Sequence, residues 1–145
     1  MRNFSLVSRM NGKGLLPERS TKNSGGYDMF AIEDVVLQPN EITYVPTGVK
    51  VSMENDEILI LANRSSNPKK KGIVLASGIN IIDADYFGNP DNEGEIILIL
   101  KNITSEPVNI NAGDKTVQAI FVKYLLTEDD NTTTERKSGS GSTGK

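Results

Sequence analysis

The sequence predicts an all-β domain followed by a polar arm. Its apolar residues come in short runs that turn-forming residues separate. Val49, Val51 and Met53 alternate with polar residues, which is the period of a strand with one buried face. No stretch carries the wider apolar period of a long amphipathic helix. About eight short strands at this spacing indicate a sandwich, a jelly roll or a closed barrel.

Each expected strand is an apolar run between two turns. The expected strands cover residues 34–37, 42–46, 49–53, 58–62, 73–76, 96–103, 108–110 and 117–126. Two of the runs, residues 58–61 and 96–100, are apolar at every position. Continuous runs predict strands that are buried on both faces, or strands with one face covered by another subunit.

The chain changes character at Thr127. Residues 127–145 contain no apolar side chain and end in a Gly/Ser-rich stretch. A segment of this composition cannot bury enough surface to offset its loss of conformational entropy. We therefore expect one domain over residues 1–126, of ordinary size for a single core, and a flexible arm over residues 127–145.

Composition excludes several kinds of chemistry. The chain has no Cys and no His, so disulfides, thiolate or imidazole metal sites and histidine-based triads are excluded. A bound metal would need oxygen ligands, which favours a hard cation such as Mg²⁺. The net charge of -3 is not typical of a nucleic-acid binder. With no signal-peptide pattern and no long apolar run, we expect a cytoplasmic protein without direct DNA or membrane binding.

The strongest candidate site lies in residues 78–88. An apolar run there ends at Asp83, and Asp85 and Tyr86 follow. Because aspartate favours turns over strands, a sharp turn is expected after the run, with Asp83 and Tyr86 facing the same space. A carboxylate at the end of a buried strand is a candidate general base. The alternative is a turn in which the aspartates bond the local backbone.

Three further segments are compatible with anion binding, although each alone also fits an ordinary turn or loop. The paired glycines before Tyr27 and Asp28 permit close backbone approach. A guanidinium beside two hydroxyls, at Arg64, Ser65 and Ser66, can cradle phosphate oxygens. Gln118, which follows a Gly-Asp-Lys turn, carries an amide that can donate to an anion.

Together and in this order, the segments resemble the five motifs of the trimeric dUTPases (deoxyuridine triphosphatases). The matching residues are Gly25-Gly26-Tyr27-Asp28, Arg64-Ser65-Ser66, Ile82-Asp83-Ala84-Asp85-Tyr86, Gly113-Asp114-Lys115 with Gln118, and Arg136 with Gly141-Ser142-Thr143-Gly144. The resemblance spans residues 24–145. It implies a jelly-roll-like distorted β-barrel and a homotrimer with composite active sites. In that arrangement one subunit supplies the third motif, a neighbour supplies the first, second and fourth, and the arm of the third subunit closes the site.

The resemblance also implies an activity and a role for each residue. The reaction is hydrolysis of dUTP to dUMP and pyrophosphate by attack of water on the α-phosphate, with Mg²⁺ on the triphosphate; it limits uracil in DNA and supplies dUMP. Asp83 resembles the catalytic base, Tyr86 the residue under the deoxyribose, and Asp28 a residue that supports Mg²⁺ through water. The other implied substrate-binding residues are Arg64, Ser65, Ser66, Gly78, Asn80, Ile82, Gln118, Arg136, Ser140, Gly141, Ser142 and Thr143.

Two positions depart from the family pattern, and two alternative functions remain. Ser140 stands where the family usually has an aromatic residue that stacks on uracil, and Asn80 stands where it commonly has glycine. A dCTP deaminase of the same fold would need a glutamate within residues 97–100, which contain no acid. The other alternative is a nucleotide-controlled regulatory protein that binds a repressor, as some phage dUTPases do.

Overall fold

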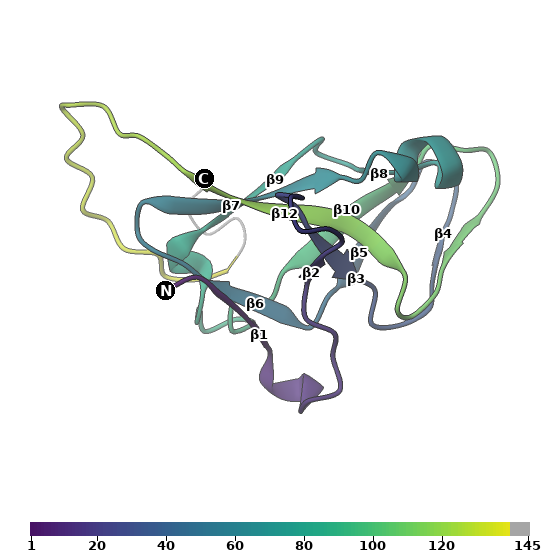
Figure 1. Ribbon diagram of the computed structural model, residues 1–145, viewed down its shortest axis with the longest axis horizontal. Helices are drawn as coiled ribbons and strands as arrows, with labels where there is room; N and C mark the ends of the chain where they lie inside the picture. The colour runs from purple at the N-terminus through teal and green to yellow at the C-terminus, as the bar shows by residue number, and fades with distance from the viewer. Residues whose placement is uncertain (140–145) are drawn as a thin grey trace.

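The computed structural model describes residues 1–139, and its regular structure is almost entirely β (Figure 1), as the sequence predicts. The strands are β1 (Asn3–Leu6), β2 (Glu18–Arg19), β3 (Tyr27–Phe30), β4 (Val35–Leu37), β5 (Ile42–Pro46), β6 (Val49–Ser52), β7 (Glu57–Asn63), β8 (Ile73–Leu75), β9 (Asn80–Asp83), β10 (Ile97–Asn102), β11 (Val108–Ile110) and β12 (Lys115–Lys123). The short helical turns are η1 (Ser8–Met10), η2 (Asn67–Lys71) and η3 (Ala84–Tyr86). None of the helices in residues 1–139 is long and apolar enough to cross a membrane.

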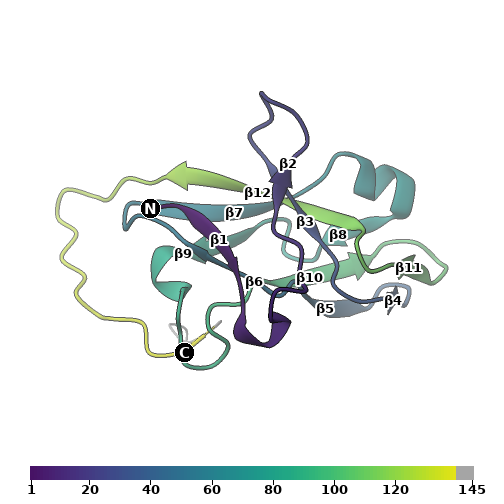
Figure 2. The ribbon, with the colours of Figure 1, turned by 60° about the horizontal axis from the view of Figure 1, so that its bottom comes forward.

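The strands form antiparallel sheets around one core. The largest sheet has the order β2-β3-β12-β7-β9, and a second has the order β5-β10-β8. Two further pairs, β1 with β6 and β4 with β11, complete the fold. Figures 1 and 2 show β12 lying along β7, in agreement with a ladder that runs from Val117–Asn63 to Lys123–Glu57. This order leaves β9 at an edge of the largest sheet.

The two continuous apolar runs are buried on one face only. In β7, Leu59 and Leu61 are fully buried in the core, whereas Ile58 and Ile60, which alternate with them, are half-buried. The same alternation holds along β10. Burial on both faces within the chain, the first of the two expectations, is therefore wrong. Cover from another subunit stays a prediction, and it fits apolar side chains on the outer face.

The eight expected strands are present, with ends displaced by up to three residues. The largest displacement is at β12, which ends at Lys123; Tyr124 beyond it bonds the backbone of Asn55 and Asp56, in the turn before β7. β9 falls in the apolar run expected before Asp83, whereas the short strands β1, β2 and β3 were not expected. β2 shows why, since its two residues, Glu18 and Arg19, are both charged and exposed and therefore carry no apolar period.

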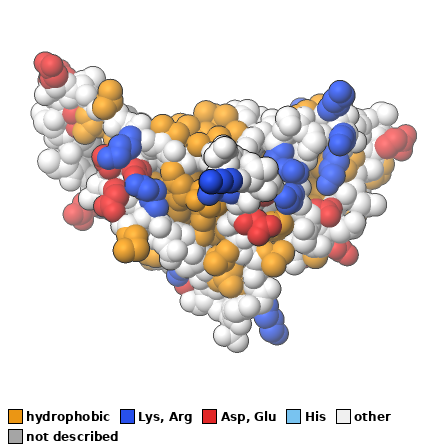
Figure 3. Space-filling view, in the orientation of Figure 1, with side chains coloured by type: hydrophobic (Ala, Val, Ile, Leu, Met, Phe, Trp, Pro, Cys, Tyr) orange, Lys and Arg blue, Asp and Glu red, His pale blue; other side chains and the backbone are white. Residues whose placement is uncertain are grey.

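The arm leaves the barrel and returns to it. Residues 127–139 contain no strand or helix. In Figures 1 and 2 the arm runs outward from the end of β12, makes a wide excursion and comes back beside η3. The domain boundary at residue 126 stays a prediction. Figure 3 shows acidic and basic side chains interspersed over one face of the molecule, with apolar side chains between them.

Candidate functional site

A cavity of about 530 Å³ lies along β9. Its lining combines an apolar wall with a few polar groups. The lining residues are Tyr44, Ser77, Ile79, Asn80, Ile81, Ile82, Asp83, Tyr86, Asn92, Ile97, Ile99 and Arg136. Apolar walls with few convergent polar groups are typical of small-molecule sites. The sequence-predicted residues Asn80, Ile82, Asp83, Tyr86 and Arg136 thus meet at one cavity.

Asp83 is the last residue of β9 and precedes the 3₁₀ turn η3, so the predicted turn is present. The prediction of a buried strand is wrong, because β9 is an edge strand on which half-buried and exposed residues alternate. The Asp83 side chain is 53% exposed. A carboxylate with this access to solvent can contact a water molecule at the mouth of the cavity.

Tyr86 is a fixed wall of the same cavity. Its ring is buried, and its hydroxyl donates to the Glu95 carbonyl at 2.8 Å. The Asn92 side chain donates to the same phenol oxygen at 2.9 Å. The phenol is therefore held by one donor and one acceptor, both from the loop that follows η3.

The arm brings Arg136 into contact with Asp83 and Asp85 of the same chain. One terminal guanidinium nitrogen lies 2.8 Å from Asp83 Oδ2, and Nε lies 2.7 Å from Asp85 Oδ1. The hydrogen bond to Asp85 is the main cause that raises the pKa of Arg136. Farther along, the Gly139 N–H donates to Asp91 at 2.7 Å. The resemblance implied an arm from another subunit; here the opposite charges of Arg136 and the aspartates bring the arm back to its own chain.

Residues 78–82 have the geometry of a turn leading into an edge strand. Gly78 has a φ of +83°, a conformation that favours glycine. The Asn80 side-chain oxygen accepts from the Ser77 hydroxyl, so this side chain is engaged in the turn. β9 pairs with β7 along one side, and an edge strand presents N–H and C=O groups along its other side.

A second polar cluster surrounds Asp28 on β3. Arg64 Nε lies 2.9 Å from Asp28 Oδ1, and Lys115 Nζ lies 2.9 Å from Oδ2. The Ser20 hydroxyl donates to Oδ2 at 2.5 Å. Burial acts to raise the pKa of Asp28, but the hydrogen bonds from Ser20 and Lys115 and the charge of Arg64 together lower it. Asp28 is therefore a carboxylate held ionised between two cations.

The other predicted phosphate contacts lie next to this cluster. Ser65 is exposed and Ser66 is half-buried, directly before the π-helical turn η2. The Gln118 amide donates to the Asn63 carbonyl at 3.0 Å, so in this structure it bonds the end of β7 and not an anion. Gly26 leaves room for the Gln118 side chain, because a Cβ at position 26 would lie 2.2 Å from Gln118 Oε1.

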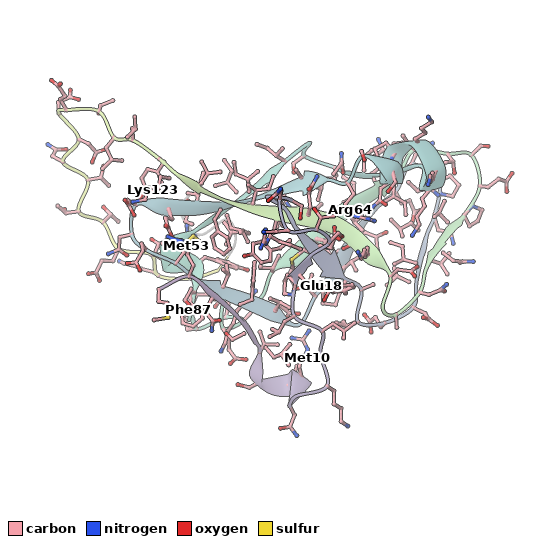
Figure 4. The ribbon with its side chains drawn as sticks, in the orientation of Figure 1. Met10, Glu18, Met53, Arg64, Phe87 and Lys123 are labelled. Carbon is pink, nitrogen blue, oxygen red and sulfur yellow. The ribbon has the colours of Figure 1, made fainter. Side chains whose placement is uncertain are left out.

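The two clusters lie at opposite ends of β7. Asp83 pairs with Ile58 near one end, whereas Arg64 directly follows Asn63 at the other. Six residues of strand at about 3.3 Å each separate them by about 20 Å. Figure 4 shows Arg64 well separated from Lys123, which pairs with Glu57 at the Asp83 end. One chain therefore does not bring the Arg64 cluster to Asp83.

Sequence reasoning missed Asn92 and the loop that carries it. The sequence of this loop does not distinguish it from an ordinary surface turn, because Asn, Asp, Gly and Pro are typical of any turn. The structure makes Asn92 part of the cavity wall. The predicted residues Ser140, Gly141, Ser142 and Thr143 lie outside the described residues.

Comparisons with known proteins agree on one family. The dUTPase family model matches residues 13–145. A deoxyuridine 5'-triphosphate nucleotidohydrolase of Lactococcus lactis subsp. lactis is 43% identical over 147 residues, covering 99% of this chain and 98% of its own. A crystal structure of a dUTPase from Streptococcus mutans has a TM-score of 0.83 and 42% identity, over 86% of this chain and 98% of that one.

A more distant structure has the same fold. It is a mutant dUTPase from phage phi11 of S. aureus, with a TM-score of 0.74 and 25% identity over 91% of this chain and 96% of that one. That structure reveals the coordination of a structural Mg(II) ion in the phage protein. The match of the family model to most of the chain, with the near full-length relative, shows that this chain belongs to the dUTPase family.

Proposed function

We propose that this protein hydrolyses dUTP to dUMP and pyrophosphate. The observation that carries the proposal is the cavity at the end of an edge strand, which both the Asp83 carboxylate and the buried Tyr86 ring line. Family membership supplies the substrate class, and the cavity supplies a base, a flat wall and free backbone groups.

Each group has a role that its surroundings support. Asp83 accepts a proton from water as that water attacks the α-phosphate, which requires a carboxylate accessible to solvent. The Tyr86 ring packs under the deoxyribose and leaves no room for a 2′-hydroxyl. The free backbone edge of β9 at Asn80 and Ile82, with the preceding turn at Gly78, hydrogen-bonds the uracil ring.

The phosphate contacts come from a second chain. A triphosphate is far shorter than the ~20 Å between Asp83 and Arg64 along β7, so the two cannot hold one nucleotide within one chain. Arg64, Ser65 and Ser66 of a neighbour would complete the site. Tyr44, Ile79 and Ile81 line the cavity together with Asp83, and each is at least 50% exposed. They are apolar side chains that such a neighbour would cover. We infer a homotrimer with three composite sites.

Mg²⁺ fits this site as an ion that is bound mainly by the phosphates of the substrate. Within residues 1–139 no cluster of three acidic, histidine or cysteine side chains could hold a metal ion. Both oxygens of Asp28 are engaged by Ser20, Lys115 and Arg64, which favours contact through water over direct ligation. Mg²⁺ is commonly held by substrate phosphates with one or two carboxylates, and it would neutralise the charge of the triphosphate.

Arg136 would act on the phosphates once substrate is present. In this structure it pairs with Asp83 and Asp85, at 2.8 and 2.7 Å. A triphosphate carries more negative charge than two carboxylates, so we infer that the guanidinium transfers to the phosphates and that the arm then closes the site. The same transfer releases Asp83 to act as a base.

A turnover assay tests the proposal. The purified protein with Mg²⁺ is expected to release pyrophosphate from dUTP and to act far more slowly on dCTP, dTTP and UTP. Turnover of dCTP with release of ammonia would support the deaminase alternative, although β10 offers Ile97–Asn102 with no acidic residue. Nucleotide binding without turnover would support the regulatory alternative and contradict the proposal.

A further inference from the structure

The loop at residues 88–95 is folded tightly onto η3. The Asn89 side chain organises it, because its oxygen accepts from the N–H groups of Asp91 and Asn92 at 3.0 and 3.2 Å. Its amide nitrogen donates to the Tyr86 carbonyl and to Asn92 Oδ1, both at 2.9 Å. The Glu93 carbonyl accepts from the Gly88 N–H at 2.9 Å and closes the loop.

Gly94 shows how closely the loop lies against η3. Its φ of +89° is a conformation that favours glycine. A Cβ at this position would lie 2.8 Å from the Phe87 Cα and 2.8 Å from the Tyr86 carbonyl oxygen. The backbone of the loop is therefore in direct contact with the backbone that carries the Tyr86 ring.

The far side of the loop is anchored to the barrel. Glu93 accepts from the Ser8 N–H and hydroxyl at 2.9 and 2.6 Å and pairs with Lys50 at 3.2 Å. Glu95 is buried, pairs with Arg9 and accepts from the Gly48 N–H at 2.8 Å. The loop is thus a rigid link between the barrel and η3.

Asn92 uses this rigid link to hold the phenol of Tyr86. Its Nδ2 donates to the Tyr86 hydroxyl oxygen at 2.9 Å, while its Oδ1 accepts from Asn89 and from the Gly94 N–H at 3.1 Å. The hydroxyl in turn donates to the Glu95 carbonyl at 2.8 Å. The phenol oxygen lies at the far end of the ring, so hydrogen bonds that fix it restrict χ1 and keep the ring from swinging away from the cavity.

We propose that Asn92 is a positioning residue that sets the discrimination between 2′-deoxyribose and ribose nucleotides. This inference rests on the proposed function and deepens it. Exclusion of a 2′-hydroxyl requires a ring that cannot move away from the sugar. A ring held only by its hydrogen bond to the Glu95 carbonyl can shift by the small distance that a hydroxyl needs. Asn92 acts through Tyr86 and not on the reacting atoms.

The test compares kcat/KM for dUTP with kcat/KM for UTP in two variants. Asn92→Asp keeps the oxygen that accepts from Asn89 and Gly94 but replaces the donor to Tyr86 by an acceptor, so the single phenol proton can serve either residue 92 or the Glu95 carbonyl and one of the two hydrogen bonds is lost; Asn92→Leu loses both the donor and the acceptor. We expect the dUTP/UTP ratio to fall about 3- to 10-fold, the usual effect of one hydrogen bond, mainly through faster UTP turnover. Asn109→Leu, an exposed position on β11, is the matched control and should leave the ratio unchanged.

A double-mutant cycle separates positioning from general loss of structure. In the Tyr86→Phe background the phenol oxygen is gone, so Asn92→Asp should lower the ratio no further. An unchanged ratio in Asn92→Asp, or an equal loss with and without the phenol, would overturn the inference. If Asn92→Leu does not fold, Asn92→Asp decides alone. Failure of the wild-type protein to hydrolyse dUTP would instead contradict the proposed function.

Discussion

Replacement of Arg136 by alanine should abolish most turnover and leave the fold almost unchanged. The arm contributes no strand or helix, and the two carboxylates paired with Arg136 are 53% and 59% exposed. Ion pairs to exposed groups contribute about 0–1 kcal/mol each, so the free energy of unfolding should fall by less than about 2 kcal/mol.

The expected catalytic effect is far larger than the effect on stability. Removal of one positioned group that stabilises transition-state charge typically lowers kcat by about 10²–10³-fold, or about 3–4 kcal/mol. Loss of Arg136 also leaves Asp83 and Asp85 without a cation, but this acts on the resting protein and not on the phosphates. Turnover should therefore respond strongly while the melting temperature hardly moves.

The assay measures pyrophosphate release from saturating dUTP together with thermal unfolding of the same preparations. Lys137→Ala is the matched control, because it removes the same charge from the exposed neighbouring residue and should change kcat by less than about twofold. A kcat for Arg136→Ala equal to that of the wild type would refute the reasoning. An equal loss in the Lys137 variant would show that only the net charge of the arm matters.

Three further predictions concern the barrel and the loop. Leu61→Ala removes a fully buried side chain from the core and should lower the free energy of unfolding by about 2–5 kcal/mol in urea titrations; a loss below 1 kcal/mol would contradict its place in the core. Gly94→Ala should destabilise the protein and lower the ratio of kcat/KM for dUTP to kcat/KM for UTP, because a Cβ at this position meets the η3 backbone. Wild-type values for both stability and ratio would show that the loop can move away from η3. Hydrogen bonds from Ser8 and Lys50 lower the pKa of Glu93 from 4.5 to about 2, so its stabilisation is present above pH 4.5 and is lost as the pH falls toward 2. Glu93→Gln should therefore be less stable than the wild type at pH 7, with a difference that closes between pH 4.5 and pH 2 in unfolding titrations.

The sequence predicts a strand most directly where its apolar side chains all face the core, as in β6. Val49 and Val51 face the core, and their alternation with polar residues reports that directly. Ile79 and Ile81 are equally apolar but lie exposed at the sheet edge. Hydrophobicity alone cannot separate a side chain that enters the core from one that faces another molecule, so the buried strand expected before Asp83 was wrong.

The site was predictable where a residue type limits the chemistry. A carboxylate and a phenol close together at a turn, as in Asp83 and Tyr86, allow few roles, and both line the cavity. Amides are less informative, because the donors of Gln118 and Asn92 can serve an anion, a carbonyl or a phenol. Only the structure assigns Gln118 to the Asn63 carbonyl and Asn92 to the Tyr86 hydroxyl.

The central claim is that Asp83 of one chain and Arg64 of another complete one site that hydrolyses dUTP. Asp83→Asn and Arg64→Ala chains, each expected to be inactive alone, can be co-expressed with different tags and purified through both. Every mixed trimer of a symmetric ring pairs an intact Asp83 with an intact Arg64 at one of its three sites, so about a third of wild-type dUTP turnover should return in the doubly purified protein. Mixed assemblies as inactive as the two parents would contradict the account.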